Sequence, residues 1–112
     1  MSQAPSASRD AVKPMVPKMV DLTEKVLFGD VWERPGLSKR DRSLITVSAL
    51  VALNRTEQLP GHLKRAIANG VTEDELVELI THLAFYAGWP SAMSAIVIAR
   101  KLLETETRPN PT

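Results

Sequence analysis

Two histidines carry most of the acid–base chemistry open to this 112-residue sequence, which contains no cysteine. His62 stands three residues after Leu59 and four before Ala66, at the edge of an apolar helical stripe. It is either a core histidine with satisfied hydrogen bonds or a functional acid, base or anion-binding group. His82 follows Glu78 by one helical turn, so these two form either an ordinary surface pair or an acid–base pair.

A cluster of basic residues precedes the most apolar stretch of the chain. Its members are Arg34, Lys39, Arg40 and Arg42, and a charged face in contact with water is the simplest interpretation. Arg42 adjoins the apolar residues, however, where an arginine needs an anionic partner, and a substrate carboxylate would be suitable. Trp32, in the preceding loop, is either a core side chain or the wall of a pocket.

The composition argues against several other kinds of site. Without cysteine there are no disulfides, thiol nucleophiles or thiolate metal ligands, and two histidines with no metal-binding spacing predict no metal site. A net charge of +1 and 4% aromatic residues argue against nucleic acid as a partner. The longest apolar run outside the amino-terminal segment, residues 49–53, is too short for a membrane span, and no apolar leader segment is evident, so we expect a cytoplasmic location.

The elements that must position these residues are predicted to be helices. Apolar residues recur at helical spacing, no stretch alternates as a strand would, and the chain is long enough for one domain. We expect an all-α domain over residues 18–104, between a flexible arm at 1–17 and a flexible tail at 105–112. Its expected helices cover residues 18–28, 39–53, 58–68, 73–87 and 90–103.

The central stretch is the pair of helices on either side of residues 88–90, Gly-Trp-Pro. Thr72 and Glu75 have the spacing of a capping box, which begins the first of the two helices. The apolar residues of that helix share one face, whereas Glu75, Glu78 and His82 fall on a different side. That side must face water, a ligand or another subunit.

Two features predict contact with a second subunit. The helix body from Leu44 to Leu53 is apolar on every side, and a monomer of this size has little room for a helix buried all round. Small residues at the start of the last helix, from Ser91 to Ala95, suit close helix–helix approach.

Three segments carry a resemblance to a known family. They read FGDVWERPGLSKRDRSLITVSALVAL, LPGHLKRAIANGVTEDELVELITHLAFYAGWPSAMSA and IARKLL. From about Leu27 to Leu103 the chain resembles the carboxymuconolactone decarboxylase family. The resemblance implies a small all-α, AhpD-like subunit that assembles into ring-like trimers or hexamers, with sites near subunit interfaces.

The wider superfamily includes peroxidases that use a Cys-x-x-Cys pair before a histidine. In this sequence His62 keeps the place of the histidine, whereas Arg55 and Gln58 stand where the two cysteines would be. Without thiols such a redox cycle is impossible. The resemblance therefore implies the decarboxylase branch, whose substrate is 4-carboxymuconolactone of the protocatechuate branch of the β-ketoadipate pathway.

Decarboxylation of this lactone requires a stabilised oxyanion, a carboxylate clamp and an acid, but no metal or organic cofactor. We expect His62 to be the proton donor or oxyanion partner and Arg42 the carboxylate clamp. His82 with Glu78 would form a second acid–base pair, and Trp32 and Arg34 would contact the substrate. The alternative is a member of the same fold that acts on or binds another small anionic ligand, without thiol peroxidase activity.

Overall fold

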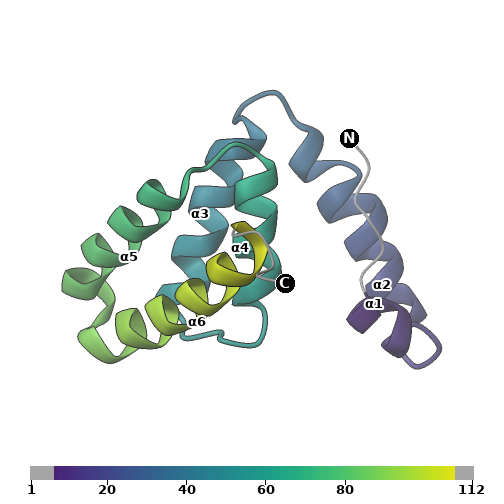
Figure 1. Ribbon diagram of the computed structural model, residues 1–112. Helices are drawn as coiled ribbons and strands as arrows, with labels where there is room; N and C mark the ends of the chain where they lie inside the picture. Colours follow the sequence, from purple (N-terminus) through teal and green to yellow (C-terminus); the bar gives the residue numbers. More distant parts are fainter. Residues whose placement is uncertain (1–6, 108–112) are drawn as a thin grey trace. The chain divides into compact units, whose positions relative to one another are not determined.

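The structure is a computed structural model that describes residues 7–107 (Figure 1). Every regular element in this range is a helix, which confirms the all-α class. The chain divides into two compact units between Lys39 and Arg40, and each is described by itself. The elements are α1 (Ala7–Val12), α2 (Pro17–Leu22), η1 (Thr23–Phe28), η2 (Val31–Glu33), α3 (Lys39–Ala52), α4 (Leu59–Ala68), α5 (Glu73–Ala87) and α6 (Trp89–Thr107).

The first unit contains a helix that was not expected. Residues 7–12 of the supposed flexible arm form α1, whereas residues 1–6 lie outside the described part of the chain. The Arg9 guanidinium lies over the Phe28 ring, 5.4 Å from its centroid, and its Nε is 3.9 Å from the Glu24 carboxylate. These contacts with a later helix were not visible in the local pattern, which showed mainly proline and polar residues.

The helix expected at 18–28 is present as α2 followed by the π-helical segment η1. It ends at Phe28, and its C-cap residue Gly29 leaves no room for a side chain, since a Cβ there would lie 2.7 Å from the Lys25 carbonyl oxygen. The Phe28 and Trp32 rings pack with their centroids 5.9 Å apart, and Trp32 is only 8% exposed. Trp32 is therefore a core side chain.

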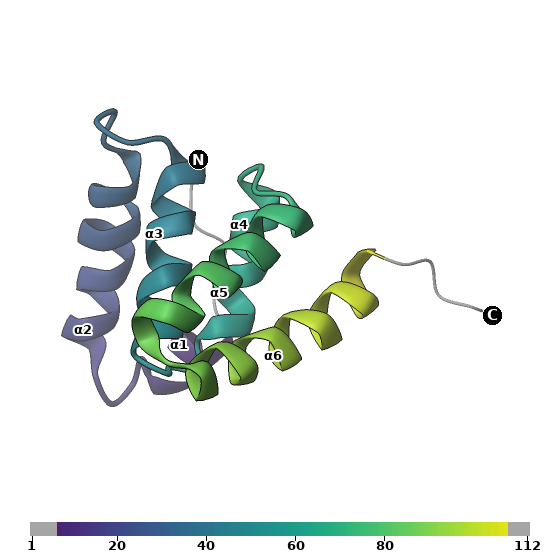
Figure 2. The same ribbon diagram turned by 90° about the vertical axis from the view of Figure 1, so that its left-hand side faces the viewer.

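The second unit holds the main core, which α3 to α6 surround. Gly88 adopts a φ of 103° and makes the short connection between α5 and α6, which pack directly on each other (Figure 2). The core side chains are Val47, Val51, Leu59, Leu63, Ala66, Val71, Leu76, Ile80, Ala92, Ala95, Ala99 and Leu103. No helix within residues 7–107 has the length and apolar character to cross a bilayer.

Most helix boundaries agree with those expected from the sequence. Helix α3 begins at Lys39, and α4 has Pro60 in its first turn and Asn69 as its C-cap. Helix α6 begins at Trp89, one residue before the expected Pro90. It continues to Thr107, so the predicted tail is helical at 105–107, and residues 108–112 lie outside the described range.

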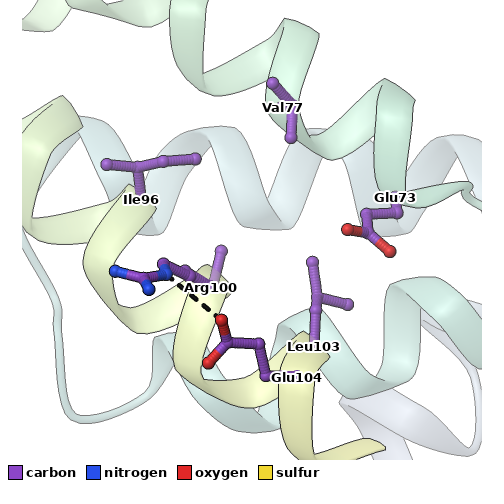
Figure 3. Close-up of a pocket in the computed structure, with 7 residues that line it drawn as sticks. Glu73, Val77, Ile96, Arg100, Leu103 and Glu104 are labelled. Atoms are coloured by element: carbon purple, nitrogen blue, oxygen red, sulfur yellow. Dashed lines mark hydrogen bonds and ion pairs between the residues drawn. The ribbon is translucent and has the colours of Figure 1, made fainter. Parts of the chain in front are cut away.

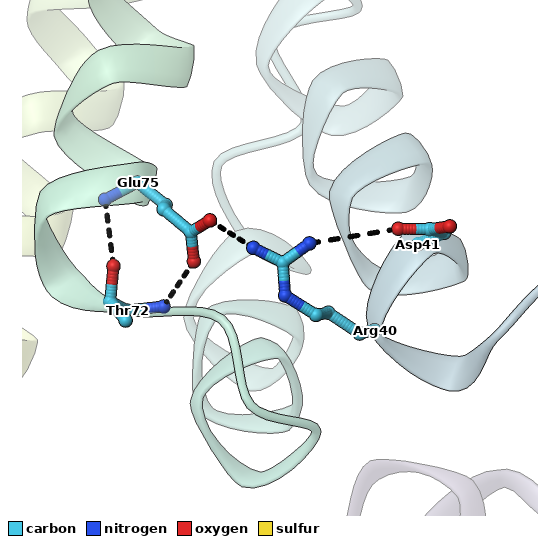
Figure 4. Close-up of polar contacts among 4 residues, drawn as sticks. All are labelled: Arg40, Asp41, Thr72 and Glu75. Carbon is cyan, nitrogen blue, oxygen red and sulfur yellow. Dashed lines mark hydrogen bonds and ion pairs between the residues drawn. The ribbon is translucent and has the colours of Figure 1, made fainter.

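A polar network joins the amino ends of α3 and α5 (Figure 4). Thr72 and Glu75 form the predicted capping box, and Arg40 makes an ion pair with the same Glu75 carboxylate. The Thr72 backbone amide, followed by Arg40, holds the pKa of Glu75 below its usual value. Glu75 therefore anchors two helices, and only Glu78 and His82 of the predicted polar stripe remain exposed.

The two features that predicted subunit contact have different outcomes. Ala92 and Ala95 are buried in the core of their own chain, so the small-residue face is used mainly inside the subunit. Helix α3 buries Val47 and Val51, but Ile45 on the same helix is 56% exposed. Helix α3 is therefore not buried all round within this chain, and contact of its exposed side with a second subunit stays a prediction.

Candidate functional site

The first candidate is His62, which α4 places at the boundary between core and solvent. Leu59, Leu63 and Ala66 give this helix its buried face, and His62 is half-buried beside them. Its Nδ1 atom is buried and has no hydrogen-bond partner among the described residues. Its Nε2 atom is not buried and has no hydrogen-bond partner among the described residues. Nδ1 is therefore buried, whereas Nε2 is open to a ligand.

This arrangement selects a tautomer for His62. A buried N–H without an acceptor is rarer in proteins than an acceptor without a donor. The favoured neutral form therefore leaves the lone pair on buried Nδ1 and carries the hydrogen on Nε2. In this form His62 presents a hydrogen-bond donor to whatever lies outside.

The electrostatic surroundings keep the ring neutral. Burial, followed by the positive charge of Arg65, lowers the pKa of His62 from its usual 6.5 to about 4. At neutral pH the imidazole is then unprotonated and a poor source of protons. Of the two roles expected for His62, the geometry favours the oxyanion partner over the proton donor.

Arg65 was not singled out from the sequence, although its spacing gave a usable signal. It lies three residues after His62 on α4, so the two side chains are neighbours on one side of the helix. Arg65 is half-buried, and its charge acts on the imidazole. A cation at i+3 from a histidine that borders an apolar stripe is the pattern that identifies this pair.

His82 and Glu78 lie in a different environment on α5. Both side chains are exposed, and no hydrogen bond or ion pair joins them among the described residues. The His82 ring instead stacks on Tyr86, with centroids 4.8 Å apart and an interplanar angle of 24°. Their role as a second acid–base pair stays a prediction.

The basic cluster is largely used in ion pairs within the chain. The Lys39 ammonium lies 3.0 Å from the Glu33 carboxylate, and Arg40 pairs with Glu75. Arg42 is half-buried near the start of α3, next to the apolar part of that helix. Arg34 is exposed in the first unit. The proposed substrate contacts of Arg42, Arg34 and Trp32 stay predictions.

A pocket of about 410 Å³ lies between α5 and α6 (Figure 3), and its lining includes none of the predicted site residues. Arg100 in this pocket makes an ion pair with Glu104 at 3.2 Å, and Glu73 adds a further negative charge. The volume suits a small ligand, but the excess of carboxylates opposes an anionic one. The lining residues are Glu73, Val77, Ile96, Ala99, Arg100, Leu103 and Glu104. Residues 7–107 contain no group of three His, Asp or Glu side chains that could hold a metal ion.

Two proteins similar in sequence to this chain are named as decarboxylases. The chain is 46% identical over 77 residues to a 4-carboxymuconolactone decarboxylase of Acinetobacter baylyi, a match covering 69% of this chain. It is 37% identical over 83 residues to nitrosuccinic acid decarboxylase of Metarhizium robertsii, covering 74% of this chain. Each match spans 58% of the relative's own length.

A more distant relative is an uncharacterized 15.0 kDa protein of Paracoccus denitrificans, 28% identical over 98 residues. That match covers 86% of this chain and 73% of the relative. The family model described as the carboxymuconolactone decarboxylase family matches residues 17–101. The chain belongs to the carboxymuconolactone decarboxylase family.

Proposed function

We propose that the chain is a decarboxylase of a small dicarboxylate. The proposed substrate is 4-carboxymuconolactone, and the product is β-ketoadipate enol-lactone in the catabolism of aromatic compounds. The observation that carries the proposal is the neutral imidazole of His62, open at Nε2, in a chain of this family. Two relatives that are named as decarboxylases support the reaction class.

The compounds in those two names share a chemical feature. Each has two carboxyl groups, and each has an electron-accepting group in conjugation with the carbon that would lose CO₂. This group is a lactone carbonyl in one compound and a nitro group in the other. When CO₂ leaves, the electrons of the broken bond move onto an oxygen of that group. The common requirement is a hydrogen-bond donor for an oxygen that becomes negative.

On the lactone, the reaction has two steps. The bond between the ring carbon and its carboxylate breaks, and its electron pair moves through the ring double bond onto the lactone carbonyl oxygen. The resulting dienolate then takes a proton on the ring carbon next to the carbonyl, which restores the carbonyl and gives the enol-lactone. The first step needs a donor at the oxygen, and the second needs an acid near the carbon.

His62 suits the first step because its donor is fixed before the reaction begins. The Nε2–H of a neutral imidazole donates to the carbonyl oxygen and binds it more strongly as negative charge develops. The buried Nδ1 has no hydrogen-bond partner among the described residues that would compete for the ring. His82 with Glu78 remains the proposed acid–base pair for proton delivery.

The direct test is turnover by the wild-type protein. Loss of lactone absorbance and release of CO₂ should occur together, in equal amounts, with purified protein. Muconolactone, which lacks the ring carboxylate, is the matched control and should release no CO₂. Nitrosuccinate, tested in parallel, reports on the substrate class. A wild-type protein that decarboxylates neither compound above the spontaneous rate contradicts the proposal and favours a ligand-binding role for this fold.

We propose further that the chain assembles with copies of itself, as trimers or hexamers. The supporting observation is an exposed apolar surface at the α5–α6 end, which we call the aromatic surface. Phe85, Tyr86 and Trp89 are 76%, 79% and 60% exposed, and Phe85 packs edge-on against Trp89 at 5.7 Å. Met93 and Val97 continue the surface along α6.

The charge pattern favours a second copy as the occupant of the aromatic surface. No Asp, Glu, Lys or Arg occurs between Leu79 and Ala99, so two such surfaces meet without repulsion or buried unpaired charge. A pocket of about 190 Å³ beside Trp89 and Met93 has room for a side chain of the second copy. Aromatic residues next to a pocket are typical of stable interfaces.

A further inference from the structure

Arg65 and His62 lie together on the side of α4 that borders the core. Arg65 follows His62 by three positions, and both are half-buried. Side chains on an α-helix tilt toward its amino end, so the long Arg65 side chain leans back over the turn that carries His62. The charge of Arg65 also acts on the His62 ring, so the guanidinium and the imidazole are close neighbours on this side of α4.

The amino end of α4 adds to the positive character of this region. Gln58 is the N-cap residue, and its side chain makes no capping hydrogen bond. Leu59 N–H donates to the Arg55 carbonyl, and Pro60 has no N–H. Gly61 therefore carries the one backbone N–H of the first turn without a carbonyl acceptor among the described residues. Such a group at the amino end of a helix attracts anions. The space beside the first turn is also open, since a Cβ on Gly61 would meet nothing within 4 Å. A small ligand can therefore approach the first turn of α4 at Gly61.

The donors on this side of α4 are complementary to oxygen ligands. Arg65 and the Nε2–H of His62 both donate hydrogen bonds, and a guanidinium binds a carboxylate through two parallel N–H···O bonds. The pocket between α5 and α6 has the opposite character, because Glu73 and Glu104 outnumber Arg100 there. Of the two locations, the α4 side is the one suited to an anion.

We propose that Arg65 is a substrate-binding residue, which holds a carboxylate of the substrate while His62 donates Nε2–H to the oxygen that gains charge. This inference rests on the proposed decarboxylase function, which by itself assigns no role to Arg65. Arg65 would bind the carboxylate that is retained, the acetate group of the lactone. It would also keep His62 neutral, and therefore in its donor form.

The test uses Arg65→Gln, Arg65→Lys and the control Lys101→Gln, which removes one exposed positive charge from α6. Succinate serves as the dicarboxylate probe and succinamide as its uncharged counterpart, with binding followed by NMR on the His62 ring. Losing a charge-assisted carboxylate contact should weaken succinate binding by about 10- to 100-fold in Arg65→Gln. Arg65→Lys should recover part of this loss, because it keeps the charge without the bidentate geometry.

Two further measurements separate this role from a structural one. In Arg65→Gln the pKa of His62 should rise, since a nearby positive charge is gone, whereas Lys101→Gln should leave it unchanged. With the lactone as substrate, Arg65→Gln should raise KM by a factor similar to the loss of succinate affinity, with a smaller change in kcat.

The outcomes distinguish this inference from the proposed function. Failure of the wild type to bind succinate, or binding that Arg65→Gln leaves within about twofold, overturns the role of Arg65 even if the lactone is turned over. Equal binding of succinamide also overturns it. If the wild type binds succinate through Arg65 but decarboxylates neither substrate, the inference stands and the decarboxylase proposal fails.

Discussion

His62 is half-buried on α4 with one ring nitrogen enclosed, whereas His82 is exposed on α5 and stacks on Tyr86. The two residues are chemically identical, and each was a candidate acid or base from its place in the sequence. The folded chain makes them different. Burial and Arg65 restrict His62 to its neutral form.

This difference shows what each environment can contribute. A histidine with one nitrogen enclosed has a fixed tautomer and a fixed donor, which suits stabilisation of a negative oxygen. A histidine on an exposed aromatic surface keeps both nitrogens open and changes its surroundings when that surface is covered. His82 would thus acquire a defined role only in the assembled protein, whereas His62 has one in the single chain.

The largest effect should come from removing the two imidazoles in turn. His62→Gln should lower kcat/KM for the lactone by about 10²- to 10³-fold, the loss typical of a removed oxyanion donor. His82→Gln should have a smaller effect, because His82 is exposed and no hydrogen bond or ion pair joins it to Glu78 among the described residues. Steady-state decarboxylation by each variant, at unchanged helical content and oligomer mass, measures the difference.

The opposite order of these losses in kcat/KM would contradict the roles given to the two histidines. If His82→Gln loses more than His62→Gln, proton delivery from the α5 surface dominates, and His62 is a packing residue. Glu78→Gln then becomes the next variant, since it removes the neighbouring carboxylate while keeping the size of the side chain.

The second effect concerns self-association through the aromatic surface, whose Tyr86 ring stacks on His82. Trp89→Ser should weaken self-association by about 30-fold or more, because truncation of a central interface aromatic commonly costs about 2 kcal/mol or more. Met15→Ser, which alters a side chain 84% exposed in the first unit, is the matched control and should leave the oligomer intact. Sedimentation velocity across a range of concentrations gives the measurement. A wild type that sediments as a 12.3 kDa monomer at micromolar concentration contradicts the assembly proposal itself.

Features set by neighbouring residues were predictable from the sequence. The capping box of Thr72 and Glu75, the proline in the first turn of α4 and the break at Gly88 each involve residues within four positions. Their geometry is specified by local sterics and hydrogen bonding, which do not depend on tertiary contacts. For the same reason the exposure of Glu78 and His82 followed from helical periodicity alone.

Features that depend on distant contacts were predicted less well. Helix α1 is accompanied by the contacts of Arg9 with Glu24 and Phe28, which local composition does not reveal. The small residues Ala92 and Ala95 pack inside the subunit, because close approach between α5 and α6 requires them there. The sequence marked His62 as a border residue, but its enclosed Nδ1 depends on the packing of the whole second unit.

The smallest effect should be a pH-dependent loss of folding stability caused by His62. The pKa of His62 is about 4 in the folded chain and about 6.5 when unfolded, so between these values the unfolded chain binds the additional proton. The contribution of the neutral His62 ring to the free energy of unfolding should therefore be fully present above pH 6.5. It should be lost as the pH drops toward 4. Because the ring is only half-buried and solvent screens it, we expect a loss of about 1–2 kcal/mol.

Urea unfolding at pH 6.5, 5.5 and 4.5 and at one fixed protein concentration measures this loss, since an assembled protein has a concentration-dependent stability. Carboxylates whose pKa is lowered, such as Glu75 and Glu33, also reduce stability at the acid end. They are common to all variants, so the difference between wild type and His62→Gln isolates the imidazole. His62→Gln should flatten the curve between pH 6.5 and 4.5. Parallel curves for wild type and His62→Gln would show that the His62 ring takes up its proton without cost, and the distinction between the enclosed and the exposed histidine would be lost.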